Sequence, residues 1–118
     1  MANPNIVNVN NIYGNTTYLV VGTASANIVQ NPASSGQLFK VNNCIVTNAN
    51  NSSVTVTLEY NKSGNIVAIA KSISVPSFAT LVLLGKDTSI YLLENEAIQL
   101  SASASNSITA ISSFEQIS

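Results

Sequence analysis

The sequence predicts an all-β protein, an antiparallel β-sandwich or jelly-roll-like fold with eight to ten short strands. The first observation is that apolar and polar residues alternate with a period of two, as in strands that place one face on a core and the other in water. The second is composition: the 118 residues include 12 valines, 12 isoleucines, 17 asparagines and 17 serines, and β-branched and short polar side chains disfavour a helical backbone. The third is that turn-forming residues recur about every 10 residues.

The N-terminal half of the chain contains four of the expected strands. They cover residues 6–13, 17–23, 37–47 and 53–60. The last of them shows the alternation most clearly, because Val54, Val56 and Leu58 share one face while polar side chains occupy the positions between them. Residues 31–36 and 48–52 are rich in residues that favour turns, so we expect loops there.

The C-terminal half contains five more expected strands, at residues 66–75, 80–84, 89–93, 97–105 and 108–117. We expect a hairpin turn at residues 61–65, where Gly64 is free to adopt a positive φ. Lys71 interrupts the apolar face of the strand at residues 66–75, which indicates a bend or a sheet edge. Pro76 ends that strand, because proline cannot donate a ladder hydrogen bond. Further turns are expected at residues 85–87, 94–96 and 106–107.

The length and the pattern indicate one β-sandwich domain, which we expect to span residues 6–118 after a flexible N-terminal arm at residues 1–5. The expected core comprises apolar side chains from alternating strand positions: Val54, Val56, Leu58, Val67, Ile69, Ile98 and Leu100. Cys44 is the only cysteine, so it cannot form an internal disulfide. Its place in a strand-like stretch predicts a buried, reduced thiol that acts as a small apolar side chain.

The charge balance excludes several classes of partner. The chain has four lysines, five acidic residues, no arginine and no histidine, for a net charge of −1. It therefore lacks the basic surface of a nucleic-acid-binding protein and the basic patch of a membrane-surface protein. The longest apolar run, at residues 79–84, is far shorter than the roughly 20 residues of a membrane span, and the first residues lack a secretory-signal pattern. We expect neither nucleic acid nor membrane as a partner.

The residue pattern offers no catalytic residue, no cofactor-binding residue and no metal ligand set. A serine or cysteine nucleophile needs a base, and the chain has no histidine and no G-x-S-x-G or S-x-x-K segment. We therefore expect no enzyme activity and no cofactor. Glu94 and Glu96 flank one turn residue and could seed a weak Ca²⁺ site. Two carboxylates are few for a cation that takes about six to eight oxygens, so a solvated turn is the preferred interpretation.

The four tyrosines leave two roles open. Tyr13, Tyr18, Tyr60 and Tyr91 offer large apolar faces with polar tips, which suits anchors of a protein interface. The same side chains are equally suited to cover the edge of a small core. The chain has no tryptophan, which argues against the aromatic sugar platform of a glycosidase or a carbohydrate-binding module.

A series of turn and strand signatures runs through nearly the whole chain. In the N-terminal half these are N-I-V-N-V-N-N-I-Y-G at residues 5–14, N-P-A-S-S-G at 31–36 and K-V-N at 40–42. In the C-terminal half they are S-V-P-S-F-A-T-L-V-L-L at residues 74–84, K-D-T-S-I-Y-L-L-E-N-E-A-I at 86–98, S-A-S-A at 101–104 and S-F-E-Q-I at 113–117. Together they resemble the small β-sandwich virion structural proteins, capsid-decoration-like, of tailed phages that infect marine bacteria and cyanobacteria.

The resemblance implies a virion β-sandwich without a known activity. Two positions depart from the usual pattern of those proteins. Asn95-Glu96 stands where Gly-Asp is common, and we expect the same hairpin because asparagine tolerates left-handed backbone. Phe114 stands where tyrosine is usual and lacks its hydroxyl group.

Together, residues and resemblance lead us to expect a non-enzymatic phage virion structural protein, a head decoration (cement) protein on the capsid exterior, assembled in the host cytoplasm. Its partners would be further copies of itself, in a trimer or another cyclic oligomer, and the major capsid protein or other virion proteins. The arm at residues 1–5 and the loops around Pro32 and Asn50 are the expected contact segments. The alternative is a neck-, tail- or fibre-associated structural protein of the virion, and a bacterial adhesin or sugar-binding module is less favoured.

Overall fold

Nine β-strands make up most of residues 11–118, the part of the chain that the computed structural model describes. In chain order they are β1 (Ile12–Val21), β2 (Ala26–Asn31), β3 (Leu38–Asn48), β4 (Val54–Lys62), β5 (Asn65–Val75), β6 (Thr80–Leu84), β7 (Ile90–Leu92), β8 (Glu96–Ala102) and β9 (Ile108–Ile117). One short 3-10 helix, η1 (Lys86–Thr88), follows β6.

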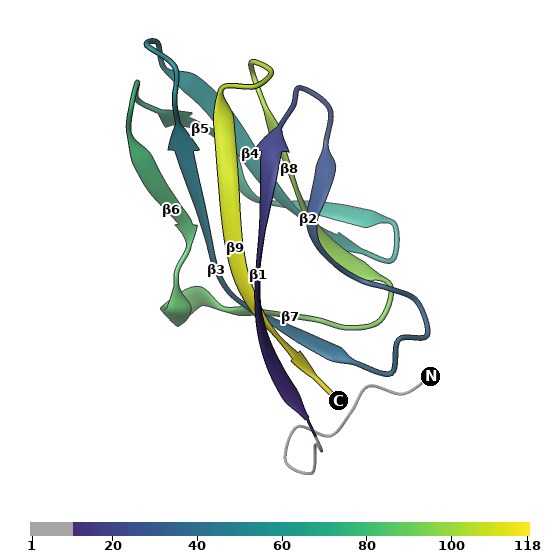
Figure 1. The fold of residues 1–118 in the computed structure, drawn as a ribbon. Helices are drawn as coiled ribbons and strands as arrows, with labels where there is room; N and C mark the ends of the chain where they lie inside the picture. The colour runs from purple at the N-terminus through teal and green to yellow at the C-terminus, as the bar shows by residue number, and fades with distance from the viewer. Residues whose placement is uncertain (1–10) are drawn as a thin grey trace.

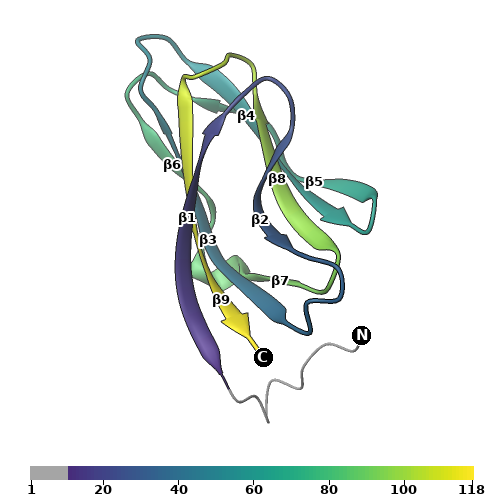
Figure 2. The same cartoon turned by 45° about the vertical axis from the view of Figure 1, so that its right-hand side comes forward.

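The strands form two antiparallel sheets that pack face to face (Figures 1 and 2). In sheet A the order is β1-β9-β3-β6, and the short β7 pairs with the beginning of β3; in sheet B the order is β2-β8-β4-β5. If the short β7 is left out, the strands form four nested pairs: β1 with β9, β2 with β8, β3 with β6, and β4 with β5. This nesting of pairs is the jelly-roll arrangement, and it confirms the predicted fold class.

The core lies between the two sheets and is made largely of aliphatic side chains. Five of the predicted core residues, all from β4 and β8, are buried: Val54, Val56, Leu58, Ile98 and Leu100. From sheet A, Phe39 and Phe114 contribute stacked rings with centroids 5.3 Å apart. Phe114 thus serves as a core aromatic, for which the hydroxyl of a tyrosine is unnecessary.

Cys44 of β3 is completely buried and free, as predicted. Burial raises the pKa of its thiol to about 12. Since the thiolate is the nucleophilic form, this side chain is chemically inert at neutral pH.

The predicted burial is wrong for Val67, which is exposed, and only partly confirmed for Ile69, which is half-buried and packs against the core. The register places Val67 opposite Tyr60 near the tip of the β4–β5 hairpin, which projects to one side of the sandwich where sheet A does not cover it (Figure 2). Ile69 has no partner in β4, because the register shifts around Leu58. The bend or sheet edge predicted at Lys71 is confirmed, because β5 is an edge strand of sheet B and the next residue, Ser72, has a φ of 51°.

The N-terminal strands also differ from expectation. Gly14 and Asn15 do not separate two strands but lie inside β1, in continuous register with β9. Residues 6–10 of the first expected strand, and the expected arm at residues 1–5, lie outside the described residues. Strand β2 was not predicted, because Ala26–Asn31 is short and borders a segment that resembles a loop.

The predicted turns are confirmed where the backbone must reverse. Ser63 and Gly64 both have positive φ, which is the geometry of a two-residue hairpin turn between β4 and β5. Asn95 and Asn106 also have positive φ, at 64° and 62°, so asparagine does replace glycine in the turn before β8. The strands at residues 80–84 and 108–117 have the predicted bounds.

Substitution of Val56 by alanine is expected to lower the free energy of unfolding by about 1–3 kcal/mol, through lost apolar burial and a residual cavity. Val56 is almost completely buried in the middle of sheet B. Urea denaturation followed by circular dichroism measures the loss. Thr55→Ala, on the opposite face of the same strand, is the control and should change stability by less than about 0.5 kcal/mol. Equal losses in the two variants would contradict the assignment of the inner face.

Candidate assembly surface

An uninterrupted apolar row crosses the outer face of sheet A. In the strand register Tyr18 of β1 lies opposite Ile111 of β9, Ile111 opposite Ile45 of β3, and Ile45 opposite Val82 of β6. Tyr18 is 73% exposed and Val82 is 62% exposed. We call these four residues the outer apolar row. Their chain neighbours point to the core, as side chains of alternating strand positions must.

Hydroxyl and amide side chains, together with the exposed Val20, flank the outer apolar row. On one side the register aligns Val20, Thr109, Thr47 and Thr80, and on the other Thr16, Ser113 and Asn43. The Thr47 and Thr80 hydroxyl oxygens are 3.1 Å apart, and those of Thr16 and Ser113 are 3.2 Å apart, so both pairs are hydrogen bonded. None of these residues is charged. Such a face can bury apolar area against another protein and exchange hydroxyl hydrogen bonds with it.

Phe78 is a further exposed aromatic residue, in the segment between β5 and β6. It lies in the turn that leads into β6 and is 72% exposed, with a φ of 55°. A bulky residue in left-handed backbone costs about 1 kcal/mol or more. The fold therefore holds an aromatic side chain in solvent at a position that a glycine would occupy without strain.

The structure divides the four tyrosines between the two roles that the sequence left open. Tyr13, Tyr18 and Tyr91 are exposed on sheet A, where they are available to an interface. Tyr60 packs against the core from sheet B and donates a hydrogen bond to Glu96.

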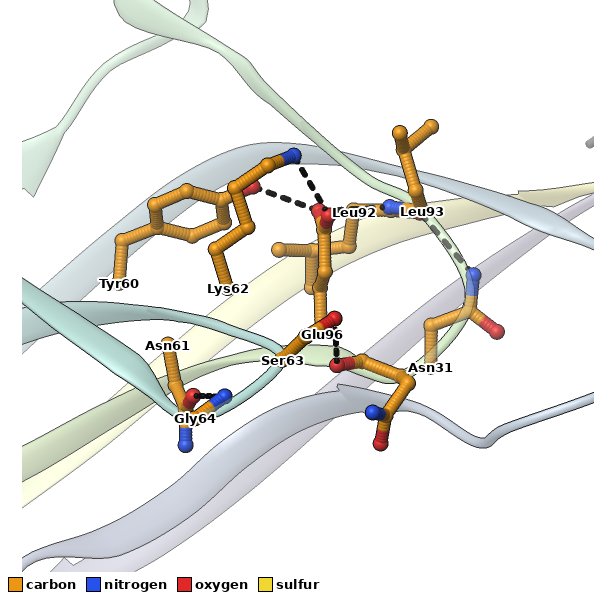
Figure 3. A network of polar contacts seen from close by, with 10 residues as sticks. Asn31, Tyr60, Asn61, Lys62, Ser63, Gly64, Leu92, Leu93 and Glu96 are labelled. Atoms are coloured by element: carbon orange, nitrogen blue, oxygen red, sulfur yellow. Dashed lines mark hydrogen bonds and ion pairs between the residues drawn. The ribbon is translucent and has the colours of Figure 1, made fainter.

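Glu96 is buried at the centre of a polar network, which corrects the preferred interpretation of this segment as a solvated turn (Figure 3). Its carboxylate accepts hydrogen bonds from the Tyr60 hydroxyl at 2.6 Å, the Lys62 ammonium at 2.9 Å and the Leu93 backbone N–H at 3.0 Å. Glu94 accepts from the Gly36 backbone N–H at 2.6 Å. The two carboxylates therefore hold different parts of the fold.

The network sets the charge state of Glu96. Burial by itself would raise the pKa of this carboxyl, but the hydrogen bonds from Tyr60, Lys62 and Leu93 outweigh it and hold the pKa below the ordinary value of 4.5. Burial and the neighbouring carboxylate raise the pKa of Tyr60, and the hydrogen bond to Glu96 raises that of Lys62. At neutral pH the site is thus a Lys62–Glu96 ion pair with a neutral Tyr60.

Within residues 11–118 no group of three or more histidine, cysteine, aspartate or glutamate side chains could hold a metal ion, and no pocket is present. In the same part of the chain no helix has the length and apolarity needed to cross a membrane. The loops around Pro32 and Asn50 lie largely at the surface, whereas residues 1–5 are outside the described part.

The outer apolar row was missed by the sequence reasoning, although a signal for it exists. A strand with one face in water alternates strictly, but residues 18–21, 44–46 and 81–84 are consecutive apolar runs. Such runs indicate that both faces of the strand are apolar. Read together, the three runs predict an apolar outer face on the sheet that contains them.

The comparisons with known proteins give a likeness of fold. No family model matches the chain, and no curated protein matches it in sequence. A solved structure from Bacillus endospore appendages, described as a novel family of disulfide-linked pili, aligns with a TM-score of 0.53 and 11% identity, covering 91% of this chain and 88% of that one. At this identity the likeness concerns the β-rich fold alone.

Proposed function

We propose that this chain is a non-enzymatic structural protein of a phage virion and that it binds the outside of the head as a decoration protein. The outer face of sheet A would be the surface that contacts the capsid. The observation that carries the proposal is the outer apolar row, an exposed and uncharged strip that crosses four strands of one sheet.

Three features support this proposal. Apart from residues 5–10, which are outside the described part, the segments that resemble phage virion proteins lie within a jelly roll, an architecture that occurs among viral capsid proteins. The apolar row and the rigid sheet beneath it provide a preformed contact surface, which reduces the ordering cost of binding. Many copies on one particle need only a modest interface each, because symmetry-related contacts act together.

Two alternatives remain as competing proposals. A neck-, tail- or fibre-associated virion protein would use the same surface with fewer copies. A filament subunit is favoured by the fold likeness to the endospore appendage pili. Unlike pili described as disulfide-linked, this sequence has one cysteine, and Cys44 is completely buried, so a filament of folded subunits would be held by non-covalent contacts.

Location on the particle tests the proposal. Immunogold labelling of particles purified from the source culture, with antibodies against the chain, should cover the heads uniformly. Labelling confined to the neck or tail would support the first alternative and overturn the head assignment. Labelling of filaments without heads would overturn the virion assignment.

The contact surface has its own test. In a double variant, Ile111→Ser and Val82→Ser, binding to heads that lack the protein should weaken about tenfold or more, because both side chains would lie near the centre of the contact, where the few residues that dominate binding energy cluster. Co-sedimentation with purified heads measures the affinity. Ile66→Ser with Val67→Ser is the matched control, because these side chains are similarly exposed but lie on the β4–β5 hairpin. An equal loss in both double variants would exclude the outer face as the contact surface.

A further inference from the structure

The four sheet edges of the jelly roll differ in how well they are protected against pairing with another strand. Edge strand β2 is six residues long and contains a register shift. Edge strand β5 contains two register shifts, Lys71 and the left-handed Ser72. On the remaining edge, beside β3, β6 has only five residues and β7 has three. Short length, bulges and lysine are the usual devices that block edge pairing. Each of these three edges has at least one of them.

Strand β1 has none of these devices. It lies beside β9 at the edge of sheet A (Figure 1). It has ten residues in unbroken register with β9, and it contains no charged residue and no proline. Asn11 and Ser118, the pair just before its first residue, exchange both backbone hydrogen bonds. Because hydrogen-bonded and non-bonded pairs alternate in an antiparallel ladder, the odd-numbered residues of β1 bond to β9 and the even-numbered ones direct their N–H and C=O groups away from it.

Two hydrogen bonds confirm that the even-numbered residues direct their backbone groups away from β9. The Thr16 N–H takes the side chain of its own neighbour, Asn15, as acceptor at 2.8 Å. The Gly22 carbonyl, also even-numbered, accepts from Ala102 of sheet B at 2.9 Å, so the free edge ends there. Within residues 11–118, residues 12, 14, 16, 18 and 20 therefore present a row of backbone donors and acceptors that is open to another strand. Thr16 is its centre, and its N–H would exchange the Asn15 side chain for a backbone acceptor on that strand.

We propose that β1 pairs antiparallel with β1 of a second copy of this chain, about a two-fold axis at Thr16. In this register residue 12 faces residue 20 of the partner copy, 14 faces 18, and 16 faces 16. It is the register in which all five open residues of each copy are paired, with about ten intermolecular backbone hydrogen bonds. This inference goes beyond the proposed function, because it concerns the sheet edge and holds whatever the chain assembles on.

The side chains of β1 suit this register on both faces. On the outer face Tyr18 lies opposite Gly14, where an aromatic ring covers the glycine backbone. Ile12 and Val20, both exposed in one copy, lie opposite each other. On the other face Tyr13 lies opposite Leu19, an aromatic–aliphatic pair of the kind that stabilises adjacent strands. No charged residue opposes another, so the strand meets its copy without repulsion.

A charge-swap experiment tests the partner and the register together. Because Thr16 would face itself across the axis, Thr16→Lys and Thr16→Glu each place like charges directly opposite, which destabilises the pair. Sedimentation velocity should show a dimer for the unmodified full chain and a dissociation constant about tenfold higher or more for each variant alone. An equimolar mixture of the two variants should restore the dimer. Thr109→Lys and Thr109→Glu, exposed on the adjoining strand β9, are the matched controls and should remain dimeric.

Circular dichroism and thermal melting establish that each variant is folded, and position 16 is exposed at an edge, so folding should be retained. A monomer for the unmodified chain at about 100 μM would overturn the proposal. Unchanged dimers in both Thr16 variants, or loss of the dimer without rescue on mixing, would overturn the two-fold register. A dimer that forms only after residues 1–10 are removed would also overturn the proposal, because it would mean that this segment, and not a second copy, occupies the β1 edge in the full chain.

Discussion

Replacement of Glu96 by alanine is expected to lower the free energy of unfolding by about 2–3 kcal/mol, because it leaves two part-buried hydrogen-bond donors without an acceptor. The Tyr60 hydroxyl and the Leu93 N–H both lose their partner. For a domain of this size the thermal midpoint should fall by about 10 °C. Thermal unfolding at pH 7, followed by circular dichroism, measures the change.

The stabilisation from Glu96 should depend on pH in a defined direction. The pKa of Glu96 is lower in the folded chain than its ordinary value of 4.5. The folded state therefore binds fewer protons, and the stabilisation is complete above the ordinary pKa and is lost as the pH falls through the lower folded value. The difference in stability between the unmodified chain and Glu96→Gln should shrink over that range. Lys62→Met is the control, and its loss should be smaller because the Lys62 side chain is 58% exposed. A constant difference from pH 7 to pH 3 would contradict the assigned ionisation.

Replacement of Asn48 by alanine is expected to cost about 3 kcal/mol, since several backbone groups would lose their hydrogen-bond partners in the interior. Asn48 is completely buried at the end of β3. Its amide donates to the Ser52 carbonyl at 2.9 Å and the Val75 carbonyl at 3.0 Å, and its side-chain oxygen accepts from the Asn50 N–H at 2.9 Å. One side chain thus fixes the loop after β3 and the end of β5. Equilibrium urea unfolding measures the loss.

The aspartate variant tests the direction of these bonds. In Asn48→Asp a carboxylate oxygen would face the two carbonyl oxygens, so the loss at pH 7 should exceed that of Asn48→Ala. Protonation of the new carboxyl restores one donor, so part of the stability should return near pH 4. Asn51→Ala, in the exposed part of the same loop, should change stability by less than about 0.5 kcal/mol. A stability of Asn48→Asp equal to that of the unmodified chain at pH 7 would contradict the assigned amide orientation.

The fold could be predicted from the sequence to a large extent, because strand periodicity and turn chemistry are local signals. Alternation identified β4 and its core face, and Gly64 and Asn95 identified the turns. The prediction that Val67 is buried was wrong, and the reason does not lie in the local sequence. A strand pattern shows which side chains share a face, but whether that face is covered depends on how far the opposite sheet extends.

The candidate surface was less predictable, because it arises from the order of strands within sheet A. Tyr18, Ile45 and Ile111 belong to three strands that are far apart in sequence, and they align only when β9 lies between β1 and β3. The role of Glu96 depends in the same way on the pairing of β4 with β8, which brings Lys62 opposite it. Composition could suggest a protein with an uncharged surface, but only the register locates the outer apolar row.

The central position of β9 in sheet A also determines when the protein can fold during synthesis. Both β1 and β3 pair with β9, with Ile12 opposite Ile117 and Val41 opposite Phe114. Until residues 108–117 leave the ribosome, the two earlier strands have no neighbour between them, and at about 5–20 residues per second that interval lasts for seconds. Pairing between distant segments is also intrinsically slow. During that interval nascent chains expose uncharged β1 strands that lack their β9 partner, which favours pairing between neighbouring chains before each one folds.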